Sequence, residues 1–229
     1  MANVFVIGAS RGIGLELARS HAARGDRVFA FVRNPDSAGG LTEAAGESAG
    51  AISVHAMDIG DPASVAQAAA GAGGASVDYL YTVAGVTGPT NNELESEIDW
   101  DAWDQAFAIM VKGPLAVFKA FLPAMHEGTK VINYSSQLAA STWPYGGMYA
   151  YGTMKNGLNR MMRSVAIDVK ERGIIVITLH PGWVKTDMGG PDADIATEES
   201  VSGTIALADR LTIEDSGDFF NWNGERHAW

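Results

Sequence analysis

The feature that most constrains the fold is a regular alternation of short apolar runs with amphipathic segments. Asn3–Ile7 is a β-branched and aromatic run, and Leu15–Arg24, beyond a glycine-rich turn, is an amphipathic stretch that ends at Gly25. Arg27–Val32 is a second, almost continuously apolar run, which is typical of a parallel strand covered on both faces. The order strand, turn, helix, strand predicts a βαβ unit at the start of the chain.

The same alternation continues along the rest of the chain. We expect further strands at Ala51–His55, Val77–Thr82, Lys130–Tyr134, Ile174–Leu179 and Asp218–Asn221, and helices at Pro62–Ala70, Trp100–Met125, Met148–Arg172 and Thr197–Arg210. The long central helix should bend near Gly113-Pro114, because proline removes a helical hydrogen bond. Seven strands alternating with six helices, without a linker, predict one α/β domain over residues 1–229. Its expected form is a doubly wound Rossmann fold, a parallel sheet of about seven strands with helices on both faces.

Composition excludes several classes of protein. The 229 residues carry 16 Lys and Arg against 27 Asp and Glu, a net charge of −11, and no cysteine. A disulfide framework, a thiolate metal site and a cysteine nucleophile are therefore excluded, and the acidic balance argues against a nucleic-acid partner. The histidines show no metal-ligand spacing. We find no apolar stretch of membrane-spanning length and no basic leader, so we expect a cytoplasmic protein without a membrane or metal partner.

The turn after the first strand has a glycine pattern, Gly8-x-x-x-Gly12-x-Gly14. Glycine lets the backbone approach a phosphate closely, and a helix N-terminus attracts its charge, so the pattern predicts a dinucleotide site. An ordinary strand-to-helix turn is the alternative. Asp58-Ile59, after the third strand, would flank the adenine of such a ligand, although a plain loop aspartate is as good an interpretation of Asp58 alone.

The end of the second strand bears on the choice of dinucleotide. An NAD site needs a carboxylate there for the ribose 2′-hydroxyl, whereas a 2′-phosphate needs a guanidinium. The chain has Arg33 and no acid at that point, and Arg11 in the glycine loop is a second cation that could reach the same phosphate. We therefore expect NADP(H) rather than NAD(H), the alternative being two solvated arginines.

The strongest catalytic pattern is Tyr151-x-x-x-Lys155, with Ser135-Ser136 at the end of the preceding strand. The spacing places phenol and ammonium on one helical face. A cation beside a tyrosine should lower the pKa of the phenol and make it a better acid–base group at neutral pH. A serine hydroxyl facing the pair would orient a carbonyl or alcohol oxygen.

Together these motifs resemble the short-chain dehydrogenase/reductase family over essentially the whole chain. The stretch from His180 to Gly190 and the tail from Asp215 to Trp229 resemble its C-factor and carbonyl reductase branch. The resemblance implies that Ser136, Tyr151 and Lys155 are catalytic. It implies that a cofactor contacts Gly8, Ser10, Arg11, Gly12, Ile13, Gly14, Arg33, Asp58, Ile59, Ala84, Gly85, Tyr151, Lys155, Pro181, Gly182, Val184 and Thr186.

Two positions depart from the family pattern. Val83 stands where the family has the asparagine of Asn-Ala-Gly, and Met110 stands where it has the asparagine of its catalytic tetrad. In the family, the backbone carbonyl of that second residue holds a water in the proton relay from the lysine. Met110 can keep the carbonyl but not the asparagine side chain, so we expect an active enzyme with an impaired or rerouted relay.

Substrate-contacting residues are expected in the loops beyond the carboxyl ends of the strands. They are Leu138, Trp143, Tyr145, Trp183 and Met188, together with Val86 and Thr87. Their aromatic and soft character favours an apolar or aromatic carbonyl compound over a sugar or organic acid. Packing of Trp143 and Trp183 in the core or an interface is the alternative.

The function expected from sequence is therefore interconversion of an alcohol and a ketone or aldehyde by an NADP(H)-dependent oxidoreductase. A cofactor-binding but catalytically weak sensor or signalling protein is the alternative, suggested by Val83 and Met110. A lyase or dehalogenase on the same fold is disfavoured, because Tyr-x-x-x-Lys with a nicotinamide site points to hydride transfer. The family resemblance also suggests a homodimer or homotetramer built on the helices at Trp100–Met125 and Met148–Arg172.

Overall fold

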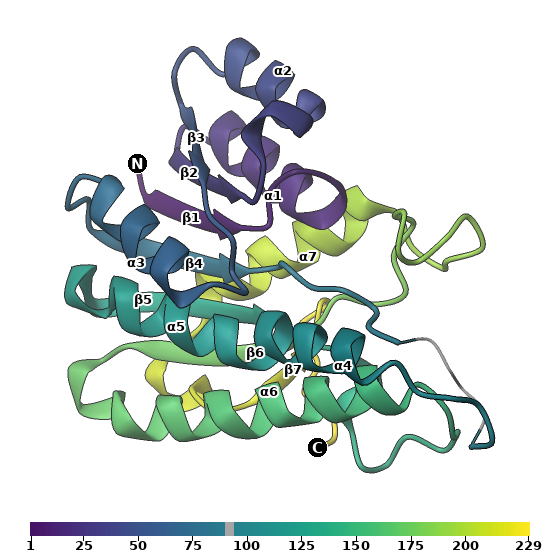
Figure 1. Cartoon of the computed structure of the whole chain (residues 1–229). Helices are drawn as coiled ribbons and strands as arrows, with labels where there is room; N and C mark the ends of the chain where they lie inside the picture. The colour runs from purple at the N-terminus through teal and green to yellow at the C-terminus, as the bar shows by residue number, and fades with distance from the viewer. Residues whose placement is uncertain (90–93) are drawn as a thin grey trace.

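The central element of the computed structural model, which describes residues 1–89 and 94–229, is a parallel sheet (Figure 1). Within those residues seven strands follow the order β3-β2-β1-β4-β5-β6-β7. They are β1 (Asn3–Ile7), β2 (Arg27–Val32), β3 (Ile52–Ala56), β4 (Val77–Thr82), β5 (Met125–Tyr134), β6 (Ile175–His180) and β7 (Phe219–Asn221). The order reverses at β1, so the loops after β1 and β4 separate toward opposite faces and leave a crevice between them.

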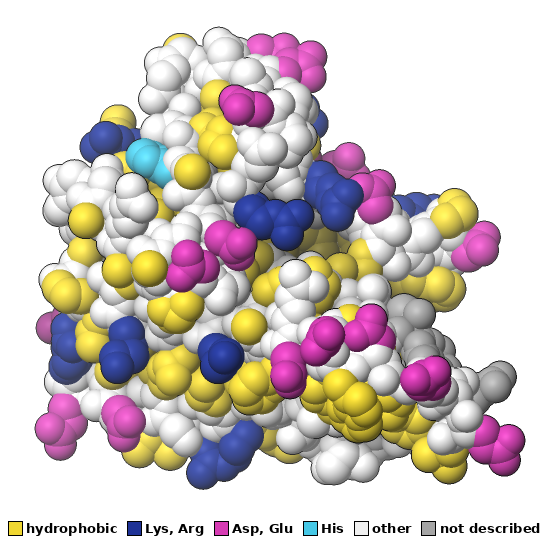
Figure 2. Space-filling view, viewed as in Figure 1, with side chains coloured by type: hydrophobic (Ala, Val, Ile, Leu, Met, Phe, Trp, Pro, Cys, Tyr) yellow, Lys and Arg dark blue, Asp and Glu magenta, His cyan; other side chains and the backbone are white. Residues whose placement is uncertain are grey.

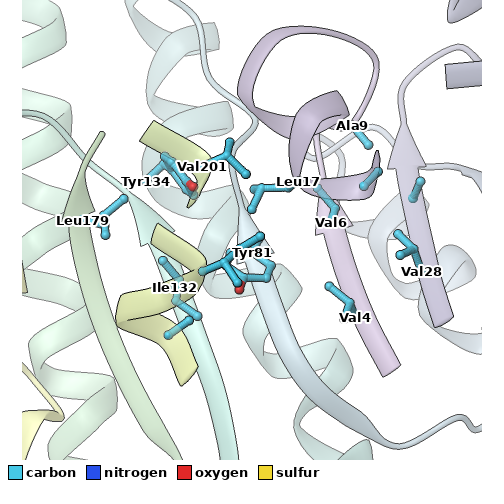
Figure 3. Packing of buried hydrophobic residues seen from close by; sticks show 14 of the residues in the cluster. Val4, Val6, Ala9, Leu17, Val28, Tyr81, Ile132, Tyr134, Leu179 and Val201 are labelled. Carbon is cyan, nitrogen blue, oxygen red and sulfur yellow. The ribbon is translucent and has the colours of Figure 1, made fainter. Parts of the chain in front are cut away.

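Helices cover both faces of the sheet. They are α1 (Gly12–Ala23), α2 (Gly39–Glu47), α3 (Pro62–Gly71), α4 (Trp100–Phe107), α5 (Gly113–Phe121), α6 (Tyr149–Asp168) and α7 (Thr197–Arg210). On one face α1, α2 and α7 pack against alternate strand residues, as Leu17 and Val201 do near Val6 and Tyr81 in Figure 3. On the other face α3, α5 and α6 form a second core. The expected fold class is confirmed.

Two elements differ from the sequence expectation. Helix α2 is additional, and its buried Leu41 and Ala44 anchor a segment whose glycines hide any helical pattern. Strand β5 begins at Met125 rather than Lys130, because a register shift between Val77 and Tyr79 of β4 allows pairing at both places.

The long central helix is continuous in space but irregular in its hydrogen bonding. Residues Ala108–Lys112 form a π-helical segment between α4 and α5, and a 3-10 turn, Leu122–Ala124, follows. The irregularity thus lies just before the expected position at Gly113-Pro114. Pro114 has no N–H, so the carbonyl of Met110, four residues earlier, lacks its α-helical donor.

One correction concerns membrane-spanning length. The helical run Trp100–Ala124 is long and apolar enough to cross a membrane by length and composition, whereas sequence inspection finds no such stretch. The run has almost the bounds expected for this helix, Trp100–Met125, and its mean hydropathy over a membrane-spanning length is the property that the sequence analysis missed. Its residues Val117, Phe118 and Phe121 belong to the core on the α3 and α6 face, so we interpret it as a core helix.

Candidate active site

The glycine loop holds the backbones of β1, α1 and β4 close together. A Cβ on Gly8, which has φ +95°, would lie 2.6 Å from the Ala84 nitrogen, and a Cβ on Gly14 would lie 2.1 Å from the Gly8 oxygen. No side chain fits at either point. The loop is therefore a cradle of bare backbone at the crevice between β1 and β4.

Helix α1 begins in this loop without a side-chain cap. Its N-cap, Arg11, is extended, and its first turn carries no acidic residue. Uncapped N–H groups and the positive end of the helix dipole together favour an anion. These features fit the pyrophosphate of a dinucleotide at Gly12, Ile13 and Gly14.

A cleft of about 320 Å³ extends from the loop. Most of the expected cofactor residues line it: Gly8, Ser10, Arg11, Gly12, Ile13, Arg33, Asp58, Ile59, Ala84, Gly85 and Thr186. Ile7, Phe31, Val32, Met57, Val83, Val86, Ile109, Asp187 and Met188 also line it. Four of these nine, Ile7, Phe31, Val32 and Met57, lie at the carboxyl ends of β1, β2 and β3, and that position is the signal that would have found them. Figure 2 shows Lys and Arg side chains at the rim of a hollow on this face.

The two arginines of the cleft differ in their surroundings. Arg33 is exposed at the end of β2. Arg11 Nη1 instead lies 3.1 Å from an Asp187 carboxylate oxygen, in a pair whose side chains are 77% and 75% exposed. Sequence inspection did not single out Asp187 as a partner of Arg11. Such an exposed pair contributes little free energy, so an anionic ligand can compete for Arg11.

Asp58 is held by its own loop. Its carboxylate accepts a hydrogen bond from Gly60 N at 2.9 Å, and its N–H donates to Ser64 Oγ at 2.9 Å. Ile59 is buried beside it. Both residues line the same cleft as Arg33, at the place where the sequence analysis expects the adenine of a dinucleotide.

The catalytic candidates meet where β5 ends and α6 begins. A side-chain hydrogen bond joins Tyr151 to Ser136, whose Oγ also accepts from Leu138 N at 3.2 Å. Lys155 Nζ donates to the Tyr134 carbonyl at 2.8 Å and lies 5.6 Å from the Tyr151 ring centroid. Of the two neighbouring serines, Ser136 is the one that reaches Tyr151, since Ser135 Oγ donates to the Lys155 carbonyl.

This cluster adjoins the cleft through Gly85. A Cβ on Gly85, which lines the cleft, would lie 3.7 Å from Lys155 Nζ and 3.9 Å from Met110 Sδ. The ammonium therefore lies just behind the cleft wall. Met110 is buried beside it.

Burial sets the charge states of the cluster. It raises the pKa of Tyr151, and the hydrogen bond from Ser136 lowers it by less. It lowers the pKa of Lys155 to about 8. The net shift of the Tyr151 pKa is thus opposite to the expected lowering, because desolvation of the phenol is its largest cause. At neutral pH the pair is a phenol and an ammonium.

The segment after β6 closes the far side of the cleft. Gly182 has φ +84°, and the buried Val184 forms a β-bridge with Ile195. Val184, Pro181 and Gly182 lie behind the lining, whereas Thr186 is part of it. Thr186 Oγ1 accepts from Gly189 N at 3.1 Å, which fixes the turn.

Among the expected substrate residues, Val86 and Met188 line the cleft. Trp183 is 47% exposed and donates from Nε1 to the Gly189 carbonyl at 2.8 Å. Trp143 and Tyr145 pack edge to face, with ring centroids 5.2 Å apart, and Tyr145 is exposed. Neither tryptophan lies in the core. Leu138, partly buried, lies two residues after Ser136 in the 3-10 turn Gln137–Ala139.

Metal ligation has no structural support in the part of the chain described. The described residues contain no group of three or more His, Asp or Glu side chains placed to hold a metal ion.

Comparisons with known proteins give a consistent result. Residues 2–195 match the family described as short chain dehydrogenase. The C-signal protein of Myxococcus xanthus is 39% identical over 158 residues, which cover 67% of this chain and 93% of that protein. The 1-hydroxy-2-glutathionyl-2-methyl-3-butene dehydrogenase of Rhodococcus sp. (strain AD45) is 31% identical over 237 residues, 100% of both chains. The NADPH-bound carbonyl reductase from chicken fatty liver superposes with a TM-score of 0.90 at 32% identity, covering 100% of this chain and 99% of that one.

Removing the buried cation should stabilise the protein. Between pH 8 and the ordinary lysine pKa of 10.5 the unfolded chain binds the Lys155 proton that the folded chain has lost, so stability rises with pH in that window. Lys155→Met should therefore be more stable than the wild type at pH 7, by up to about 3 kcal/mol. Urea unfolding at pH 7 and pH 10 measures the difference, which should shrink at the higher pH. Equal differences at both pH values would contradict the buried ammonium.

Proposed function

Because this chain belongs to the short-chain dehydrogenase family, we propose that it is an oxidoreductase that reduces a ketone or aldehyde to an alcohol with NADPH. The observation that carries the proposal is the hydrogen-bonded pair Tyr151 and Ser136, with Lys155 behind the cleft wall. The carbonyl reductase from chicken fatty liver, with NADPH bound, supports it.

The residues of the cluster divide the proton chemistry between them. When bound, the nicotinamide supplies the hydride. Ser136 accepts from Leu138 N and donates its one proton to Tyr151. A substrate's oxygen that takes the place of Tyr151 as the acceptor is oriented by this proton. Tyr151, a phenol at neutral pH, donates a proton to that oxygen, and the ammonium of Lys155 stabilises the phenolate that forms. A protonated Tyr151 is the state that reduction requires, which favours this direction.

The cofactor preference rests on Arg33. It lines the cleft at the end of β2, free of the ion pair that occupies Arg11. A guanidinium there suits a 2′-phosphate. The carbonyl reductase of Pseudomonas aeruginosa PAO1, solved with NADP, has a TM-score of 0.91 at 31% identity over 100% of both chains and supports the same choice.

The substrate class follows from the mouth of the cleft. Met188 lines the cleft, and Trp183 and Tyr145 are exposed on the loops that follow β6 and β5. We propose an apolar or aromatic carbonyl compound, which such side chains contact favourably. The absence of cysteine fits the reducing cytoplasm, where we place the protein.

A second candidate is a cofactor-binding protein with little catalysis. Val83 and Met110, at positions where the family has asparagine, favour it. NADPH consumption over a panel of carbonyl compounds, run beside an NADPH-binding titration, separates the two. Tight binding with persistent inactivity would support the second candidate, and turnover of an aromatic ketone or aldehyde the first.

Tyr151→Phe tests the acid–base assignment. Without the hydroxyl there is no proton donor at the substrate's oxygen, so kcat should fall about 100- to 10,000-fold. NADPH affinity, measured by fluorescence titration, should stay within about twofold because the ring remains. Tyr149→Phe, two residues earlier on α6, is the matched control and should keep wild-type turnover. Retention of most turnover in Tyr151→Phe would remove Tyr151 from its role.

Arg33→Ala tests the phosphate site. Loss of a charge-assisted contact to the 2′-phosphate should raise KM for NADPH about 10- to 100-fold and leave KM for NADH unchanged. Arg19→Ala, an exposed arginine of α1 away from the cleft lining, is the control. Equal effects on both dinucleotides would assign the 2′-phosphate to another residue.

We also propose that the chain self-associates through α4 and α6. Trp100, Phe107 and Ile167 on these helices are 63%, 42% and 66% exposed, and Figure 2 shows hydrophobic side chains gathered on this side. An apolar surface of this kind is typical of an interface with a second copy. Sedimentation velocity should give a multiple of 24.1 kDa for the wild type and a smaller species for Trp100→Glu. A wild-type monomer would refute the dimer or tetramer.

A further inference from the structure

Behind the proposed active site, a row of polar side chains crosses the interior of the sheet. Thr82, Asn133 and Thr178 are adjacent in register on β4, β5 and β6. All three are buried. Each lies two residues after Leu80, Val131 or Val176 on its strand and therefore shares a face of the sheet with them. These three apolar residues belong to the core that includes α6, so the polar row faces that helix.

Helix α6 places one more polar residue against this face. Asn159 is 1% exposed and lies one turn beyond Lys155, between the buried Leu158 and Met162. An i,i+4 spacing sets Asn159 and Lys155 side by side on the buried stripe of the helix. The polar row and Asn159 thus occupy the same layer between sheet and helix, next to Lys155.

Most polar atoms of this layer lack a partner in the described part of the chain. Neither Asn159 Oδ1 nor Nδ2 has a hydrogen-bond partner there, and the same is true of Thr82 Oγ1 and Thr178 Oγ1. Asn133 Nδ2 makes one long bond, 3.4 Å, to the Ile177 carbonyl. Buried polar atoms are costly unless they are satisfied, and ordered water satisfies them where several converge.

Among the residues described, the ammonium of Lys155 has donors without acceptors, whereas the polar layer has atoms without partners. An ammonium has three donors, and the described residues supply one acceptor, the Tyr134 carbonyl. Tyr151 stands near it, one turn earlier on α6, whereas His180, at the end of β6, packs against His227. Neither carries a negative charge at neutral pH. Water in the polar layer would supply the missing acceptors.

We propose that Thr82, Asn133, Thr178 and Asn159 hold ordered water between the sheet and α6, and that Asn159 is the positioning residue through which this water hydrogen-bonds the ammonium of Lys155. The proposal rests on the role of Lys155 in the proposed function. It gives the lysine a hydrated connection on the side away from the cleft. It also explains why polar side chains that the proton transfer at Tyr151 does not use are buried between the sheet and α6.

The direct test is a crystal structure of the whole chain at a resolution that shows water. Ordered water within hydrogen-bond distance of both an Asn159 side-chain atom and Thr178 Oγ1 is expected. A dry layer in which these side chains bond directly to one another would overturn the proposal. This outcome does not depend on any enzymatic activity.

The second test follows the titration of Lys155. In Asn159→Leu, a swap of similar size, loss of the held water should lower the pKa of Lys155 by about one unit. The rise of unfolding free energy with alkaline pH, measured in urea, should then begin about one unit lower than in the wild type. The alkaline limb of kcat for carbonyl reduction should move by the same amount.

Two further variants separate positioning from simple packing. Asn159→Ser keeps a polar group and room for water, so it should restore the wild-type pH dependence. Met162→Leu, one turn along the same buried stripe, should leave it unchanged. An unshifted titration in Asn159→Leu, or an equal shift in Met162→Leu, would overturn the proposal. If every variant and the wild type are inactive, the proposed function fails, while the urea series still decides the water layer.

Discussion

The contact on which the rest of the molecule depends is the backbone crossing at the end of β1. Gly8 meets Ala84 of the β4 loop and Gly14 of α1 at distances that leave no space for a Cβ. Because the strand order reverses at β1, this crossing fixes the first helix, the crevice beside it and the cleft wall at Gly85 at once. Substitution there would move the binding cradle and the wall in front of Lys155 together.

The cleft of this protein is locally positive although the chain as a whole is negatively charged. A net charge of −11 would repel an anionic ligand, yet an uncapped helix N-terminus and Arg33 make one end of the cleft positive. Deeper in, burial controls the ionisation of Lys155 and Tyr151, and it pushes both toward the neutral form. The exposed Arg33 thus makes one end of the cleft suitable for an anion, whereas the buried ammonium of Lys155 lowers the stability of the fold.

Sequence patterns predicted the parts of this structure that depend on local spacing. Strands β1, β2 and β4 have the expected bounds, and Tyr151 and Lys155 share a helical face as their i,i+4 separation requires. Features that depend on packing between distant segments were missed. The pairing of Arg11 with Asp187 joins residues far apart in the chain, and the direction of the Tyr151 pKa shift depends on how much protein surrounds the ring. The helix α2, rich in small residues, carries too weak a pattern to predict.

The π-helical segment in the central helix changes what the two halves of that helix can face. One residue beyond the α-helical count rotates everything after it by about 100°. Ala106, before the segment, and Met110, within it, pack with Ala150 and Met154 of α6. After the segment, Val117, Phe118 and Phe121 pack into the core beside α3. A straight helix would carry one apolar stripe along one side. The extra residue gives this helix two apolar stripes that are rotated relative to each other. One continuous helix therefore packs against α6 at its first end and against the sheet at its second.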